Sequence, residues 1–209
     1  MNLSAARAEM TFTTQWDIES SREFVARTRE LSAQHGRAPG SLKVLPGIMP
    51  FVGSTEQEAQ ALVREFGSFV DVAGLSAFLT HHLGNLDLSD LDPDAPLPDL
   101  RPRLGNNASV SRPRLYIETA LEEALSLREL AQRIALTLGH RPVIGTPEAI
   151  ADDLEQWFTA GAADGFIVLP ADLPQGLRDF GEQVVPILQE RGIFRREYTG
   201  STLREHLSE

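Results

Sequence analysis

Two adjacent histidines are the side chains best suited to acid–base chemistry in this 209-residue sequence. His81 and His82 stand in the stretch HHLGNLD, at the start of a long proline-rich segment. Histidine titrates near neutral pH, so either ring can take up or deliver a proton in a binding site. Neighbouring helical residues point about 100° apart, so the pair is poorly arranged to hold one metal ion. We predict an acid–base histidine here and no metal site; a structural or solvent-facing role for one of the two stays open.

Four arginines gather in and beside the same segment, on an acidic background. They are Arg101, Arg103, Arg112 and Arg114. One interpretation is that they balance the aspartates of the segment in a solvated arm. The other is recognition of an anionic ligand, because a planar guanidinium matches a phosphate or a carboxylate.

Several function classes are excluded by what the sequence lacks. It contains no cysteine, which leaves no disulfide framework, thiolate zinc site or catalytic thiol. It has no Gly-rich phosphate loop and no Gly-x-Ser-x-Gly elbow. The formal net charge of −11 argues against nucleic acid and against an anionic membrane as partners, and no apolar run reaches the roughly 18 residues of a membrane span. We expect a cytoplasmic protein that acts on a small molecule.

The elements that must position these residues alternate between strands and helices. Strand patterns cover residues 10–15, 41–53 and 165–170, and helical patterns lie between them. Strands separated by helices pair in parallel, so the sequence predicts an α/β fold with a parallel sheet. Phe12 and Thr13 lie toward the carboxyl end of the first strand, where parallel α/β folds bind ligands. A plain core position is the alternative for Phe12.

Local signals predict where helices begin and where strands are interrupted. Four helix starts carry capping residues: Asp17, Ser54 with Gln57, Ser126 with Glu129, and Thr146 before Pro147. Pro46 and Gly47 inside the second strand predict a bulge or an early strand end. Residues 84–113, rich in proline, predict a long loop that is either a functional lid or disordered.

Five stretches, in order along the chain, resemble one protein family. They are AEMTFTTQ, LKVLPGIMPFVGSTEQEA, DLSDLDPDAPLPDL, GHRPVIGTPEAIADDLEQWFTAGAADGF and GIFRREYTGSTLREHL. Together they resemble the C-terminal half of the nitrilotriacetate and dibenzothiophene-sulfone monooxygenases, within the bacterial-luciferase-like flavin monooxygenases. The resemblance covers essentially the whole chain.

The resemblance implies a partial (β/α)8 TIM barrel, in which residues 1–209 form a single C-terminal portion with about the last three strands and several helices. Residues 84–113 correspond to the lid-like insertion. The implied cofactor is reduced FMN, supplied by a separate NADH:flavin reductase. Reaction of the flavin with O2 gives a flavin peroxide, which oxygenates a small organic substrate.

The resemblance also implies roles for six residues. It places Phe12 and Thr13 beside the flavin, with Arg112 near an anionic group of the cofactor. It implies His82 as the catalytic residue, and His81 and Val143 as residues of the substrate pocket.

The same resemblance places the first barrel strands, with most flavin contacts, before Met1. We therefore expect a partner, an N-terminal half-barrel from a second chain or a longer reading frame, and a homo-oligomer. The alternative is a non-catalytic remnant that acts as a self-associating scaffold. A weaker alternative is a relative that uses the deazaflavin cofactor.

Overall fold

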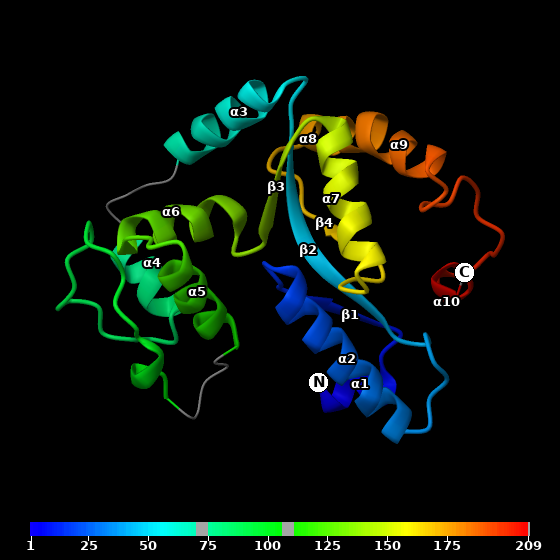
Figure 1. Cartoon of the computed structure of the whole chain (residues 1–209), viewed down its shortest axis with the longest axis horizontal. Helices are drawn as coiled ribbons and strands as arrows, with labels where there is room; N and C mark the ends of the chain where they lie inside the picture. The colour runs from blue at the N-terminus through cyan, green and yellow to red at the C-terminus, as the bar shows by residue number, and fades with distance from the viewer. Residues whose placement is uncertain (70–74, 106–110, 209) are drawn as a thin grey trace. The chain divides into compact units, whose positions relative to one another are not determined.

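The computed structural model describes residues 1–69, 75–105 and 111–208 of the chain (Figure 1). Its residue contacts divide the chain into two compact units. Unit 1 comprises Met1–Val63 and His140–Glu209, and unit 2 comprises Arg64–Gly139. No helix among the described residues is both long enough and apolar enough to cross a membrane.

Unit 1 is built on a parallel sheet whose central strand is β2. The strands are β1 (Met10–Thr13), β2 (Lys43–Val52), β3 (Arg141–Gly145) and β4 (Ile167–Val168). β2 pairs in parallel with each of the other three. The parallel α/β prediction is confirmed. The sequence predicted three strands, and the structure adds β3 as a fourth.

The two edges of β2 carry different partners, because backbone groups alternate between the edges of a strand. The Lys43 amide donates to the Glu9 carbonyl at 2.9 Å and the Gly53 amide to the Gly145 carbonyl at 3.1 Å, so β1 and β3 share one edge. The Ile48 carbonyl accepts from the Leu169 amide at 2.8 Å on the opposite edge, beside β4.

This alternation explains why proline does not interrupt β2. The expected bulge or early end at Pro46 and Gly47 was wrong, since β2 runs without a break from Lys43 to Val52. Pro46 and Pro50 occupy even-numbered positions, like Ile48, so each nitrogen faces the edge of the two-residue strand β4. The missing N–H groups therefore remove no hydrogen bond from the pairing with β1 and β3.

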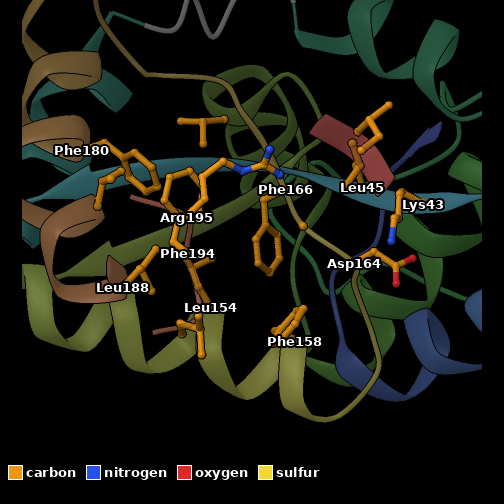
Figure 2. Close-up of a pocket in the computed structure, with 15 residues that line it drawn as sticks. Lys43, Leu45, Leu154, Phe158, Asp164, Phe166, Phe180, Leu188, Phe194 and Arg195 are labelled. Atoms are coloured by element: carbon orange, nitrogen blue, oxygen red, sulfur yellow. The ribbon is translucent and has the colours of Figure 1, made fainter. Parts of the chain in front are cut away.

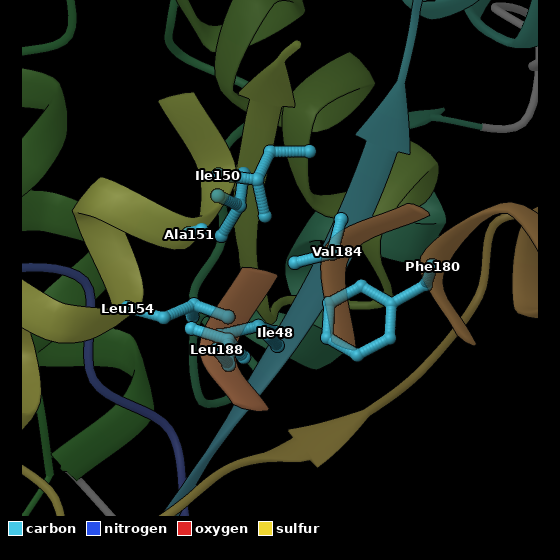
Figure 3. Packing of buried hydrophobic residues seen from close by; sticks show 8 residues of the cluster. Ile48, Ile150, Ala151, Leu154, Phe180, Val184 and Leu188 are labelled. Carbon is cyan, nitrogen blue, oxygen red and sulfur yellow. The ribbon is translucent and has the colours of Figure 1, made fainter. Parts of the chain in front are cut away.

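Unit 1 also contains helices, namely α1 (Asn2–Arg7), α2 (Ile18–Gln34), α3 (Glu56–Ser68, which runs into unit 2), α7 (Pro147–Thr159), α8 (Gln175–Asp179), a π-helical turn (Phe180–Val184), α9 (Val185–Glu190) and α10 (Leu203–Ser208). Of these, α7, the π-helical turn and α9 pack against one face of the sheet. Side chains of β2, α7 and α9 point toward one another in a core that includes Ile48, Leu154 and Leu188 (Figure 3). Removing these apolar groups from water is the main force that holds the helices on the sheet.

Most of the predicted helix starts are confirmed in atomic detail. Asp17 accepts from the Ser20 amide at 2.8 Å, and Thr146 accepts from the Ala149 amide at 3.3 Å. The start of α3 was predicted one residue too early, because the hydroxyl of Thr55, rather than that of Ser54, accepts from the backbone of this helix.

Unit 2 contains α4 (Leu75–His82), a short 3-10 helix (Arg101–Arg103), α5 (Ser111–Glu122) and α6 (Leu127–Thr137). Ser126 and Glu129 form the predicted capping box of α6. The described part of the predicted insertion is anchored by buried leucines, namely Leu86, Leu88, Leu97 and Leu100. This segment has its own apolar anchor points within unit 2.

Candidate functional site

The ring of Phe12 lies on a buried histidine in unit 1. The ring centroids of Phe12 and His140 are 5.1 Å apart and their planes differ by 18°, an offset stack. His140 is 5% exposed, whereas Phe12 is 51% exposed. One side of the Phe12 ring is thus supported by packed protein, while much of its surface remains open to a ligand.

Gly47 makes room for this stack. A Cβ atom at position 47 would lie 2.7 Å from Cε2 of Phe12 and would also collide with Nδ1 of His140. Real Cβ atoms do not approach other atoms so closely, so any side chain here would displace one of the two rings. Gly47, Phe12 and His140 therefore form one unit, which we call the Phe12 stack.

The Phe12 stack lies on the face of the sheet opposite the helix-covered core. Side chains alternate between the two faces of a strand, and Ile48, next to Gly47, points into the core against α7 and α9. Gly47 therefore faces the other way.

Thr13 lies apart from Phe12 despite being its neighbour in sequence. Phe12 pairs in register with Leu45 and Thr13 with Pro46, so the two side chains point to opposite faces. The Thr13 hydroxyl accepts from the Gln15 amide at 3.1 Å. The structure does not bring these two predicted cofactor residues together.

Val143 also lies away from the Phe12 stack. It is 5% exposed on β3 and belongs to the core with Ile48 and Ile150. Its position is that of a packing residue beneath α7.

The remaining predicted residues meet in unit 2. The rings of His81 and His82 are 5.5 Å apart, and Phe78 lies edge-on to His82 at 4.1 Å. Burial lowers the pKa of His82, and His81 and Arg112 lower it further. His81 and Arg112 are thus close enough to act on His82, which is held toward its neutral, proton-accepting form.

Tyr116 on α5 is the nearby buried acid of unit 2. Its side chain is 1% exposed, and burial raises its pKa, while Arg112 lowers it. The phenol is therefore protonated at neutral pH. Within the described residues, no three His, Asp or Glu side chains gather as metal ligands would.

Two of the four clustered arginines have carboxylate partners. Arg101 donates to Asp99 at 2.8 and 2.7 Å, and Arg103 donates to Asp90 at 3.1 and 2.8 Å. For Arg101 and Arg103 the solvated-arm interpretation accounts for the positive charge, and Arg112 is the arginine that lies with the histidines.

A cavity of about 710 Å³ opens beside β4 in unit 1 (Figure 2). Its lining is largely apolar and includes Leu154 and Phe158 from α7, with Lys43 and Asp164 at one end and Phe180 at the other. Among the described residues, β4 pairs with β2 alone. The cavity therefore lies at an edge of the sheet that has main-chain groups and apolar surface to offer.

Asp164 protects the part of this edge that precedes β4. Its side chain accepts from the Val44 amide and from Arg29, each at 2.8 Å, and its own amide donates to the Val44 carbonyl at 3.0 Å. A carboxylate thus takes the place of a strand carbonyl beside β2.

The family described as luciferase-like monooxygenase matches residues 1–164. The chain belongs to this family. The predicted relationship to the nitrilotriacetate monooxygenase group is confirmed.

Two curated relatives of this luciferase-like chain illustrate the relationship. N-acetyl-S-(2-succino)cysteine monooxygenase of Bacillus subtilis is 42% identical over 98% of this chain and 46% of its own length. Nitrilotriacetate monooxygenase component A of Aminobacter aminovorans is 43% identical over 98% of this chain and 45% of its own length. The chain spans about half the length of the curated relatives it matches, and it corresponds to their C-terminal half.

A solved luciferase-like structure has a similar backbone. Riboflavin lyase, crystallised with modified FMN and riboflavin, superposes with a TM-score of 0.78 at 27% identity, over 99% of this chain and 44% of that protein. The likeness supports the α/β architecture of the described chain.

Sequence reasoning missed two residues of the Phe12 stack. His140 follows a helix end and precedes an unpredicted strand, so nothing in its neighbourhood connects it with Phe12, 128 positions earlier. Gly47 was interpreted as a strand breaker. Gly47 lies two residues beyond Leu45, the partner of Phe12, so it is on the same face of the sheet as Phe12. A glycine at that spacing was the signal that could have indicated room for a ring.

Proposed function

We propose that this chain forms the C-terminal half of an FMN-dependent monooxygenase that inserts one oxygen atom of O2 into a small organic substrate. The observation that carries the proposal is the Phe12 stack, a half-exposed aromatic ring on a packed base, in a chain of the luciferase-like family.

The residues present fit the ring system of FMN. The exposed surface of Phe12 is flat and apolar, which suits a planar heterocycle, and Gly47 leaves the ring in that position. Reduced FMN supplies the capacity to activate O2, and this chain supplies an apolar surface that orients the ring and excludes water. Thr13 and Val143, whose side chains lie on the other face, are not part of this proposed contact surface.

Unit 2 contains the polar residues to which we assign roles in the proposed reaction. His82, neutral because its pKa is lowered, can accept a proton from the substrate or from its leaving group. Arg112, which influences His82, can attract an anionic group of a substrate or cofactor, and the ring of His81 lies beside that of His82.

The cavity beside β4 supports the need for a second half. We propose that an N-terminal half-barrel pairs with β4 and fills the apolar cavity, which would complete the partial TIM barrel. The chain covers 45–46% of the two relatives, so these contain a comparable length of protein that this chain does not supply. Whether that half belongs to the same polypeptide or to a second chain does not alter the proposal.

A flavin reductase, a homo-oligomer and a cytoplasmic location complete the proposal. One relative is named as component A of its monooxygenase, which supports a separate protein as the source of reduced FMN. The acidic composition is compatible with a cytoplasmic protein.

Flavin titration of the chain with and without its N-terminal half tests the proposal. We expect the two halves together to bind one FMN with a saturable change in flavin fluorescence, and the chain alone to bind weakly or not at all. Absence of binding by both, together with a stable dimer of the chain alone, would contradict the proposal and favour the self-associating remnant.

In the assembled protein, His82→Ala should lower turnover more than it lowers FMN affinity. Unchanged turnover would remove His82 from the mechanism.

A further inference from the structure

We propose that His140 is the positioning residue of the Phe12 stack, and that it sets the orientation in which Phe12 meets a planar ligand. The inference rests on the proposed function for the identity of that ligand, FMN. It concerns a residue that neither the sequence patterns nor the resemblance singled out.

The two stacked rings differ in burial. His140 is 5% exposed and Phe12 is 51% exposed, so His140 is fixed by packing whereas Phe12 is not. A half-exposed phenylalanine on a four-residue strand has few other restraints. The stacked imidazole, 5.1 Å away and 18° from parallel, is the flat surface that restricts its ring.

A second feature is the absence of a side chain between the rings and β2. Gly47 permits the close approach of both rings, because a Cβ would collide with Nδ1 of His140 and lie 2.7 Å from Phe12. The three residues come from β2, from β1 and from the residue before β3. The strand pairing therefore fixes their spacing before any ligand binds.

The stack also restricts the chemistry of the recognised ligand. The geometry presents a single aromatic face with no charged group of its own, which suits a planar, uncharged ring system such as an isoalloxazine. Pre-orienting that face reduces the entropy lost when the ligand binds. Removing the support should therefore weaken binding even though His140 itself does not touch the ligand.

The test uses three variants of the chain in complex with its N-terminal half. His140→Ala removes the support and should weaken FMN binding roughly three- to tenfold, the range of one aromatic pair. His140→Phe restores a ring and should recover most of the affinity. Gly47→Ala should weaken binding to a similar degree, whereas Gly181→Ala, where a Cβ meets nothing within 4 Å, should have no effect.

A second readout does not depend on flavin. NMR order parameters of the isotope-labelled Phe12 ring, measured in the chain alone, should fall in His140→Ala and recover in His140→Phe. A variant that merely loosens the fold would lower the order of other buried rings, such as that of Phe180, as well.

The outcomes separate this inference from the proposed function. Unchanged Phe12 order and unchanged FMN affinity in His140→Ala would overturn the positioning role. If the assembled wild-type protein binds no FMN, the proposed function fails. In that case the Phe12 order parameter still decides whether His140 positions the ring.

Discussion

Two regions on opposite faces of the central strand β2, the core around Ile48 and the Phe12 stack, differ in how far their side chains are exposed. On one face Ile48 packs with Ile150 and Leu154 of α7, and all three are at most 3% exposed. On the other face the Phe12 ring is half exposed although its support, His140, is buried. The first arrangement maximises apolar burial, which is what stability requires. The second leaves an aromatic surface in contact with water on a rigid base, which is what ligand binding requires. The adjacent positions 47 and 48 of β2 therefore belong to different structures. Ile48 is part of the core, and Gly47 makes room for the Phe12 stack.

The largest expected effect is a loss of stability from a substitution in the core around Ile48. Ile150→Ala should lower the free energy of unfolding by about 2–5 kcal/mol, because it removes a fully buried side chain and leaves a cavity. Urea denaturation of the chain measures this loss. Leu177→Ala, at a position 49% exposed, is the control and should change stability by less than about 0.5 kcal/mol. Similar losses in the two variants would contradict the sealed core.

A smaller loss of unfolding free energy should follow from changing Asp164, which lies beside the edge of β2 that pairs with β4. Asp164→Ala leaves the Val44 amide, on a fully buried residue, without its carboxylate acceptor and should cost about 1–3 kcal/mol. Arg29→Ala removes only the half-exposed ion pair to the same carboxylate and should cost about 0–1 kcal/mol. If the two variants lose equal stability, the carboxylate matters as an ion-pair partner rather than as a substitute for a strand.

A substitution in the Phe12 stack should change the affinity for FMN more than the free energy of unfolding. Phe12→Ala should weaken FMN binding by the assembled protein roughly tenfold, about 1.4 kcal/mol, with little loss of unfolding free energy. The control is Tyr198→Ala, since Tyr198 is 66% exposed and belongs neither to the Phe12 stack nor to the lining of the cavity beside β4. Fluorescence titration gives both affinities. Equal effects of the two substitutions would contradict the role of the Phe12 ring.

The smallest expected effect is a change in the pKa of His82, a histidine whose surroundings differ from those of His140. We propose His140 as an aromatic support and His82 in unit 2 as a proton acceptor. Burial, then His81 and Arg112, lower the pKa of His82, so NMR titration should place it below the ordinary value of about 6.5. Arg112→Ala should raise it. A pKa at or above the ordinary value in the wild type would contradict the described surroundings of His82.

The same shift has a defined sign in stability. Below about pH 6.5 the unfolded chain binds a proton at His82 that the folded chain still excludes, so the folded state is disfavoured. The contribution of His82 is therefore fully present above that pH and is lost as the pH falls through the lower folded pKa. The difference between wild type and His82→Ala in unfolding free energy should change with pH in this window.

Helix starts were predictable because their signals are local. Asp17, Ser126 and Thr146 each act on an amide three residues away, so a short window of sequence contains the whole interaction. Parallel pairing of strands separated by helices follows from a similarly general rule.

The remaining features depend on contacts between distant segments. The uninterrupted course of β2 depends on which edge Pro46 and Pro50 face, and this is decided only when β1, β3 and β4 are in place. The histidines and Arg112 were predicted as site residues from residue type alone, and this stays a prediction. His140 acquires its role only through a neighbour 128 positions away, and no local pattern reveals such a contact.

The most direct test of the contrast between the faces is hydroxyl-radical footprinting of the assembled protein with and without FMN. If the Phe12 ring contacts the flavin, oxidation of Phe12 should fall when FMN is added, while oxidation of the exposed Tyr198, outside the cavity beside β4, stays the same. Phe12 oxidised at the same rate with and without saturating FMN would contradict the account.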